Sequence, residues 1–382
     1  MLKGIKCALF RGGTSKGLFF LKSDLPLNKD LWSDIFLSLM GSPDHLQVDG
    51  LGGGIATASK VAIISVADSD KYDIDYLFAQ VAVDKPIVSY RGNCGNICSA
   101  VGPFAIESGL IKATDPETVV RIHNVNTDKL IYAYVPTRDN KVMYEGNFEI
   151  AGVPGTSACI KMAFQNPSGS VTGKLLPTGN AVDTIFIPGF GHIEASFVDS
   201  SNPLVFIRAK DIGMTGKELP DEIDSNTQLM ELLERIRGIA AVKLGFINNY
   251  NESRRKSPTV PKLSMVSVSQ KYVTTNGKEV RPDKYDISCR MMSMQKTHKN
   301  YALTGAMCTA SAAVIEGTIV NELVKKDFDS RKLLIGHPGG IMHAGVEYQM
   351  EIDGSINITW AIGYRTARML MRGTAFYLNR QK

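Results

Sequence analysis

Two short stretches far apart in the sequence align with each other and differ at one chemically important position. They read Asn-Cys-Gly-Asn-Ile-Cys-Ser-Ala at residues 93–100 and Leu-Thr-Gly-Ala-Met-Cys-Thr-Ala at residues 303–310. Cys94 in the first stretch therefore corresponds to Thr304 in the second. A cysteine can take and return a proton as thiolate and thiol, whereas threonine does not ionise in this way. The aligned pair predicts a proton-transfer site with a single thiol.

Cys94 stands between Asn93 and Gly95, where the sequence predicts the start of a helix over residues 95–107. The N-terminus of a helix offers N–H groups without intrahelical acceptors and the positive end of the peptide dipoles, which stabilise a thiolate or a bound carboxylate. A small residue packed near a turn is the alternative interpretation. The remaining cysteines have no zinc-type spacing with histidines, so no metal is expected. These are expected to be packing or core residues: Cys7, Cys98, Cys159, Cys289 and Cys308.

Lys60 is the second candidate for proton transfer. It follows the glycine-dense segment 50–54 and directly precedes an apolar run over 61–66, which predicts a strand. An isolated ammonium at the mouth of a buried strand is costly. Such a lysine can act as a general acid or base, or as a fixed charge that stabilises a carboxylate or an enolate. A solvated lysine that ends a strand is the alternative.

A glycine-rich turn and a histidine complete the candidate set. Residues 12–17 read Gly-Gly-Thr-Ser-Lys-Gly, but the order Ser-Lys and the strand that follows exclude a nucleotide-binding loop. The turn is instead expected to be a hairpin whose N–H groups and Ser15 hydroxyl bind carboxylate oxygens, or a plain glycine turn. His298 lies just before the second aligned stretch and is interpreted as a hydrogen-bond donor, a proton shuttle or a surface histidine.

The elements that position these residues form two similar sets. Helices are predicted over 95–107 and 303–314, both rich in small residues, as buried helices enclosed by a sheet often are. A second internal similarity, between residues 18–25 and 205–212, supports a duplication. A strand is predicted over 142–150, and the Pro-Gly-Phe-Gly segment at 188–191 is the expected link between the halves. The pattern favours an α+β fold in which each half wraps a sheet around a central helix.

Bulk composition sets broad limits on function. With 382 residues the chain is expected to form about two domains. Its 44% hydrophobic and 21% charged residues are typical of soluble globular proteins. The net charge of +5 is mild and the basic residues are scattered, so nucleic-acid binding is not expected, whereas an anionic substrate is compatible. No apolar stretch approaches the length of a membrane span, no signal peptide is recognised, and six cysteines suggest reduced thiols in the cytoplasm.

Four motifs, in order along the chain, resemble the PrpF family. This family includes 2-methylaconitate cis-trans isomerase, 3-methylitaconate Δ-isomerase and 4-oxalomesaconate tautomerase. The resemblance runs from about residue 5 to about residue 375, and it is specific for the family but not for the substrate. The motifs are Arg-Gly-Gly-Thr-Ser-Lys-Gly at 11–17, Gly-Leu-Gly-Gly at 50–53 with Ser-Lys-Val-Ala at 59–62, Gly-Asn-Cys-Gly-Asn at 92–96 and Gly-His-Pro-Gly at 336–339.

The resemblance implies a diaminopimelate epimerase-like fold with two topologically similar domains and no cofactor. The expected domains are residues 1–184, joined by a returning C-terminal segment at 366–382, and residues 185–365. Cys94 and Lys60 inherit the catalytic roles by their place in the motifs. The residues expected to bind substrate are Ser15, Thr14, Asn93, Gly95, Asn96 and His298.

The expected reaction is the movement or inversion of a C=C double bond in a small unsaturated di- or tricarboxylate. Loss of a proton next to the conjugated carboxylate gives a dienolate, and return of the proton completes the isomerisation. An amino-acid epimerase is the first alternative, although Thr304 replaces the second cysteine that such enzymes carry. A tricarboxylate-binding accessory protein is the other alternative, and assembly into a homo-oligomer is left open.

Overall fold

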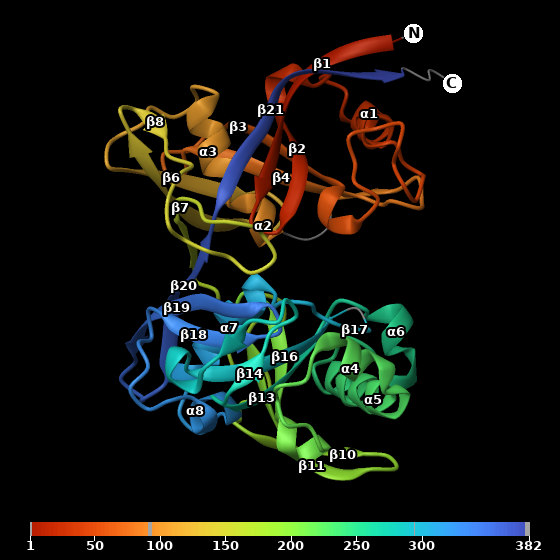
Figure 1. Cartoon of the computed structure of the whole chain (residues 1–382), viewed down its shortest axis with the longest axis vertical. Helices are drawn as coiled ribbons and strands as arrows, with labels where there is room; N and C mark the ends of the chain where they lie inside the picture. Colours follow the sequence, from red (N-terminus) through yellow and green to blue (C-terminus); the bar gives the residue numbers. More distant parts are fainter. Residues whose placement is uncertain (1, 91–93, 294, 379–382) are drawn as a thin grey trace. The chain divides into compact units, whose positions relative to one another are not determined.

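The computed structural model describes residues 2–90, 94–293 and 295–378. The chain forms two compact units, of which the first comprises Met1–Ala163 and Tyr364–Lys382 and the second comprises Phe164–Gly363 (Figure 1). The first unit thus contains both ends of the chain. Its C-terminal strand pairs antiparallel with its N-terminal strand, so that Leu2 lies opposite Leu378.

The first unit combines a mixed sheet with three α-helices among its described residues. Its strands are β1 (Leu2–Gly12), β2 (Ser15–Leu21), β3 (Lys60–Val66), β4 (Ile74–Val81), β5 (Val88–Ser89), β6 (Glu117–Asn124), β7 (Lys129–Arg138), β8 (Lys141–Val142) and β21 (Ala367–Leu378), and β9 (Ile160–Gln165) ends at its border. Its helices are α1 (Trp32–Met40), α2 (Gly95–Cys98) and α3 (Val101–Glu107), with short 3-10 turns at Lys22–Asp24, Lys29–Leu31 and Ala56–Ala58.

The second unit is built in the same way but carries longer helices. Its strands are β10 (Asp183–Ile187), β11 (Gly191–Asp199), β12 (Pro203–Arg208), β13 (Lys262–Val268), β14 (Tyr272–Val273), β15 (Glu279–Val280), β16 (Ile287–Ser293), β17 (Lys296–Thr297), β18 (Leu333–His337), β19 (Gly340–Met350) and β20 (Ile356–Arg365), the last of which ends in the first unit. Its helices are α4 (Pro220–Ser225), α5 (Thr227–Lys243), α6 (Ser253–Lys256), α7 (Leu303–Val314) and α8 (Ile319–Leu323), with 3-10 turns at Ala209–Ile212, Tyr250–Glu252 and Pro282–Lys284.

The strand pairings show the duplication directly. In the first unit the neighbours β1–β2, β2–β3, β3–β4, β4–β6 and β6–β7 pair antiparallel, parallel, antiparallel, parallel and antiparallel. In the second unit β11–β12, β12–β13, β13–β16, β16–β18 and β18–β19 repeat the same series. The predicted fold class, with two topologically similar halves, is therefore confirmed.

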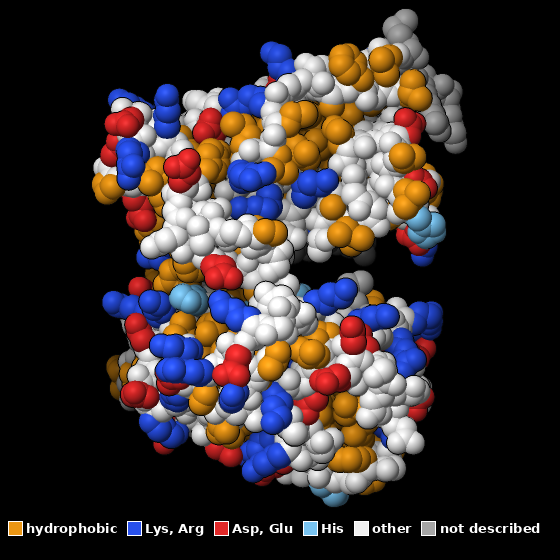
Figure 2. All heavy atoms as spheres, in the orientation of Figure 1, with side chains coloured by type: hydrophobic (Ala, Val, Ile, Leu, Met, Phe, Trp, Pro, Cys, Tyr) orange, Lys and Arg blue, Asp and Glu red, His pale blue; other side chains and the backbone are white. Residues whose placement is uncertain are grey.

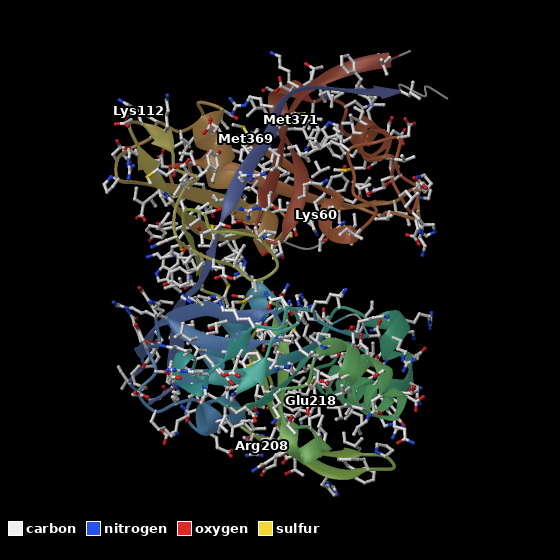
Figure 3. The ribbon with its side chains drawn as sticks, viewed as in Figure 1. Lys60, Lys112, Arg208, Glu218, Met369 and Met371 are labelled. Atoms are coloured by element: carbon white, nitrogen blue, oxygen red, sulfur yellow. The ribbon has the colours of Figure 1, made fainter. Side chains whose placement is uncertain are left out.

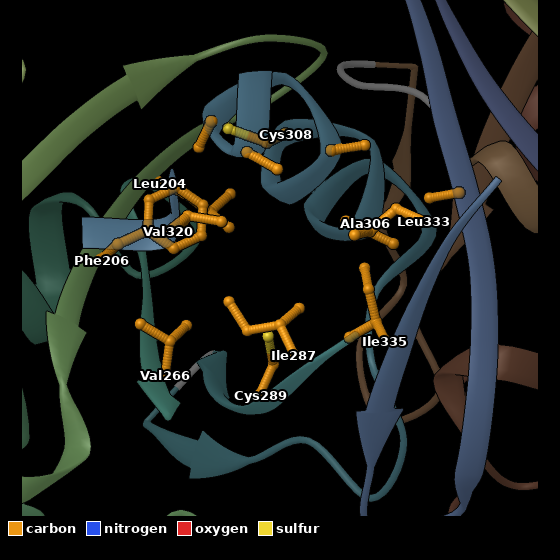
Figure 4. Close-up of a cluster of buried hydrophobic side chains, with 14 of the residues drawn as sticks. Leu204, Phe206, Val266, Ile287, Cys289, Ala306, Cys308, Val320, Leu333 and Ile335 are labelled. Carbon is orange, nitrogen blue, oxygen red and sulfur yellow. The ribbon is translucent and has the colours of Figure 1, made fainter. Parts of the chain in front are cut away.

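Each unit encloses one helix rich in small residues. In the first unit, Phe104 of α3 packs on the rings of Phe10 and Phe19, which come from β1 and β2. A Cβ atom on Gly102 would lie 2.8 Å from a methyl group of Val135, so the glycine lets α3 approach the sheet closely. In the second unit the alanines and Cys308 of α7 belong to a buried cluster with side chains of β12, β13, β16 and β18 (Figure 4).

Two predicted elements differ from the structure. The strand expected over 142–150 is limited to Lys141–Val142, because Gly146 presses against the backbone of Ala158 and only Phe148 forms a bridge, with Ser157. The segment 188–191, expected to link the halves, is the turn of the β10–β11 hairpin inside the second unit. Glycines with positive φ suit tight hairpin turns as well as linkers, and both Gly189 and Gly191 have positive φ.

Surface and helix properties agree with the bulk composition. On the face shown in Figure 2, the basic side chains of the second unit are interspersed with acidic ones. Within the described parts of the chain, none of the helices is both long enough and apolar enough to span a bilayer.

Candidate active site

Lys60 begins strand β3 and is held in a defined orientation. Its side chain lies within the first unit (Figure 3), and the residue is only 8% exposed. Its Nζ donates a hydrogen bond of 2.6 Å to Oε1 of Gln80, the residue directly opposite it on β4, and lies 5.2 Å from the centroid of the Phe78 ring. The Gln80 amide nitrogen in turn donates to the carbonyls of Ala56 and Ser59. The ammonium is therefore fixed by neutral groups, an arrangement suited to a charge that meets an anionic substrate.

The glycine-dense loop before Lys60 folds around Gln47, which the sequence prediction missed. Gln47 is 1% exposed, its Nε2 donates to Ser59 Oγ at 2.8 Å, and its Oε1 accepts from the Gly54 amide at 3.0 Å. A Cβ atom on Gly52 would lie 2.2 Å from Gln47 Oε1. The loop thus needs its glycines to pack on this glutamine, which also holds the residue preceding Lys60. Its only sequence signal is an amide side chain beside a glycine-rich run.

Ser15 lies at the start of the strand next to Lys60. Strands β2 and β3 pair in parallel, with Gly17 opposite Lys60, and a Cβ atom on Gly17 would lie 2.5 Å from the Lys60 carbonyl oxygen. Ser15 is 3% exposed and begins β2, two residues before this contact. The hairpin predicted from the glycine-rich motif thus exists, and it places Ser15 on the strand beside that of Lys60.

Cys94 is the N-cap of α2 and is partly buried. Its carbonyl accepts a hydrogen bond of 2.9 Å from the Cys98 amide, so it begins the helical turn as predicted. The helix expected over 95–107 is interrupted, however, after Cys98. Pro103 has no N–H to donate to the Ser99 carbonyl, and α3 begins only at Val101. The first helical segment is a single turn, so its dipole is weaker than that of a full-length helix.

The side chains of Thr14 and Asn96 bind each other. Asn96 Nδ2 donates to Thr14 Oγ1 at 3.1 Å, and Asn96 Oδ1 accepts from Arg365 Nε at 3.0 Å. Gly95 is the buried first residue of α2. Arg365 was not among the predicted residues. Asn93, which was, lies outside the described residues.

His298 and Thr304 lie in the second unit. The His298 amide donates to the Met291 carbonyl at 2.8 Å, and its Nδ1 accepts from the Asn300 amide at 3.1 Å. Thr304 is in the first turn of α7, and its hydroxyl accepts from Nδ2 of Asn202 at 3.5 Å. The predicted cooperation of His298 with Cys94 and Lys60 stays a prediction.

Burial raises the pKa of the other cysteine thiols. Burial raises the pKa of Cys98 and of Cys308, whose Sγ donates to the Val198 carbonyl. Burial also raises the pKa of Cys289 to about 12 and that of Cys159 to about 11. These thiols are held protonated at neutral pH. Among the described residues, no group of three or more His, Cys, Asp or Glu side chains is placed to hold a metal ion.

Comparison with solved structures identifies the fold. A crystal structure of methylitaconate-delta-isomerase aligns with a TM-score of 0.90 and 43% identity, covering 98% of this chain and 96% of that chain. A probable proline racemase from Agrobacterium radiobacter aligns with a TM-score of 0.53 at 12% identity, covering 99% and 93%, and shows the likeness of fold alone. The epimerase-like fold expected from the sequence is confirmed.

Sequence comparison identifies the family. The chain is 43% identical to 3-methylitaconate isomerase of Eubacterium barkeri over 373 residues, which cover 97% of each protein. It is 37% identical to 2-methyl-aconitate isomerase of Shewanella oneidensis over 382 aligned positions, covering 97% of this chain and 96% of that protein. The family described as PrpF protein matches residues 2–378. The chain therefore belongs to the PrpF family.

Proposed function

We propose that this chain is a cofactor-independent isomerase that moves or inverts a C=C double bond in a small unsaturated di- or tricarboxylate. The class rests on its relatives, which are named isomerases and align along nearly the whole chain. The predicted enzyme class, isomerase, is thereby confirmed. Because those relatives differ in their named substrates, the substrate of this chain is proposed only at the level of its chemical class.

The proposed mechanism assigns the proton transfer to Cys94. The Cys94 thiolate removes a proton from the carbon next to the conjugated system, the π electrons shift to give a dienolate, and the thiol returns the proton at the far carbon. The product has the same atoms and the same oxidation level as the substrate, so no co-substrate is needed. If the dienolate rotates about its partial single bond before it is reprotonated, the product is a geometric isomer of the substrate.

Lys60 supplies the charge that the dienolate requires. The observation that carries this part is the hydrogen bond from its Nζ to the neutral Gln80 amide inside the first unit. A fixed ammonium in a water-poor site stabilises a developing carboxylate-linked anion more than water does. Ser15, at the start of the neighbouring strand, and His298, from the second unit, are proposed to bind the carboxylates.

The position that corresponds to Cys94 argues against an epimerase. Inversion at one carbon through opposite faces needs a second acid or base, and Thr304 occupies that place. Its hydroxyl is a hydrogen-bond acceptor for Asn202. We therefore favour a reaction in which the proton is removed and returned on the same face of the substrate.

Incubation with a panel of unsaturated acids in deuterated water tests the proposal. The panel contains methylitaconate, cis and trans methylaconitate and oxalomesaconate, and proton NMR follows loss and appearance of the vinyl and methyl signals. We expect purified protein alone to convert at least one acid, with deuterium entering the product or exchanging into the substrate. Absence of conversion for every acid, in protein shown to be folded, would favour an accessory binding role instead.

A further inference from the structure

Three segments far apart in the sequence meet at Asn96, two residues after Cys94, within the first unit. They are the glycine turn of the β1–β2 hairpin, the first turn of α2, and the junction between β20 and β21, where Arg365 lies. Arg365 is 4% exposed although its side chain carries a charge. A buried guanidinium needs hydrogen-bond acceptors to offset the loss of water. The hydrogen-bond acceptors of Arg365 therefore indicate which segments its side chain connects.

The contacts of Arg365 form a chain that reaches the hairpin. Its Nε donates to Asn96 Oδ1 at 3.0 Å and its Nη1 to the carbonyl of Tyr364 at 2.8 Å. The Asn96 amide then donates to Thr14 Oγ1 at 3.1 Å. One asparagine side chain thus connects the arginine to the residue before Ser15, and that asparagine follows Cys94 by two positions.

The residue after Arg365 makes a second connection to the same hairpin. The Gly13 amide donates to the Thr366 carbonyl at 2.9 Å. Arg11 Nη1 donates to that carbonyl, to Thr366 Oγ1 and to the Gly13 carbonyl at 2.9–3.0 Å. The first two glycines of the motif, Gly12 and Gly13, are required by this packing. A Cβ atom on Gly12 would lie 2.5 Å from the Asn96 carbonyl oxygen, and one on Gly13 would lie 2.2 Å from Asn96 Oδ1.

We propose that Arg365 is a positioning residue that fixes the turn of Cys94 to the Ser15 hairpin through the side chain of Asn96. The inference rests on the proposed thiol mechanism, because it concerns where that thiol stands. It also gives Asn96 and Thr14 a different role from the predicted one, since their side chains bind each other and Asn96 also binds Arg365. Burial lowers the pKa of Arg365 to about 10, and the guanidinium still stays charged at neutral pH.

Arg365→Gln removes the charge and the reach to Asn96 and is the first test. We expect kcat to fall about tenfold to a hundredfold, with KM changed much less, because a displacement of the reacting group of about 1 Å costs that much rate. The alkylation rate of Cys94 by iodoacetamide, located by mass spectrometry, should change in the same variant. Arg368→Gln, at an exposed arginine three residues further on and at the start of strand β21, is the matched control and should leave both rates unchanged.

A double-mutant cycle separates positioning from general stability. If Arg365 acts through Asn96, Asn96→Ala should lower kcat by itself and add little to the loss in Arg365→Gln. Arg365→Lys, which keeps a donor and the charge, should recover part of the activity. If Arg365→Gln does not fold, Asn96→Ala and Thr14→Val provide the test. Each should have a lower kcat than the wild-type protein when it is assayed at a temperature below its Tm.

Three outcomes would overturn the inference: unchanged kcat and alkylation in folded Arg365→Gln, fully additive losses in the cycle, or unchanged kcat in both substitute variants. Cys94→Ser distinguishes this failure from failure of the proposed function. If Cys94→Ser is inactive while Arg365→Gln is fully active, only the positioning role is refuted. If Cys94→Ser is fully active, the thiol mechanism itself is refuted.

Discussion

At the scale of single residues, burial decides how readily several of the cysteines ionise. Cys98 and Cys308 are fully buried, and burial raises their pKa because a charge without water is unfavourable. Cys94 is partly buried and is the N-cap residue of α2. Cys94 is the thiol that we propose to be reactive.

We expect iodoacetamide to inactivate the enzyme with modification of one thiol, Cys94. The deeply buried cysteines should react only when the fold opens. A dicarboxylate that occupies the site should slow the reaction. Mass spectrometry of the partly inactivated protein checks this, and activity loss without label on Cys94 would contradict it.

Gln80 should matter for catalysis through Lys60. Gln80→Leu removes the acceptor of the Lys60 ammonium, so the ammonium gains freedom and loses its fixed direction. We expect kcat to fall about tenfold, an order of magnitude consistent with losing one positioned electrostatic contact. Steady-state kinetics checks this, with Gln349→Leu at an exposed position of β19 as the control. Wild-type kcat in folded Gln80→Leu would show that the orientation of Lys60 is unimportant.

At the scale of elements, helices and strands were predictable where one local pattern dominates. The helix at Leu303–Val314 has the predicted bounds, because small and apolar residues run through it without proline. The helix expected over 95–107 is split, because Pro103 removes a backbone donor after the first turn. The missing part of the strand over 142–150 reflects the contact between Gly146 and Ala158, which no local pattern reveals.

Strands β4 and β6 carry a pH-dependent contact. Asp75 and His123 are paired across them, and the His123 ring contacts Asp75 at 2.8 Å and Asp128 at 3.0 Å. Burial opposes protonation, but these carboxylates raise the pKa of His123 above its ordinary value of 6.5. Protonated His123 thus stabilises the fold fully below that ordinary value, and the contribution is lost as pH rises through the raised pKa.

We therefore expect His123→Gln to lower Tm more at about pH 5.5 than at about pH 8.5. Thermal unfolding at both pH values measures the difference. His45→Gln, at an exposed loop position, is the control. An equal loss at both pH values would mean that the charge on His123 does not contribute.

The close approach of α3 to its sheet should be sensitive to volume. Gly102→Val places methyl groups where Val135 and Ala133 already stand, and overpacking of this kind typically costs about 1–3 kcal/mol. Urea unfolding should show this loss. Gly109→Ala, where the added Cβ meets nothing within 4 Å but φ is +73°, should cost about 1 kcal/mol from backbone strain alone. Unchanged stability of Gly102→Val would contradict the tight packing.

At the scale of the whole molecule, the chain is a duplication whose two copies keep the strand order and differ at the aligned residues Cys94 and Thr304. The aligned stretches at 93–100 and 303–310 made the duplication predictable from sequence, whereas the single catalytic thiol stays a prediction. Arg365 and Gln47 were not predictable, because each acts through contacts between segments distant in sequence or through a loop wrapped around one side chain. The glycines of the 11–17 motif predicted a turn, but they did not predict that Arg365 packs against it.

The central claim is that only the first copy supplies a catalytic thiol, and the comparison of Cys94→Ser with Cys308→Ser tests it most directly. Both variants are assayed as folded proteins on the acid that the wild-type enzyme converts. Cys94→Ser should lose most isomerisation, because a serine hydroxyl ionises far less readily than a thiol. Cys308→Ser should keep substantial turnover, since its thiol is buried against the Val198 carbonyl. Full activity in Cys94→Ser, or equal losses in the two variants, would contradict the account.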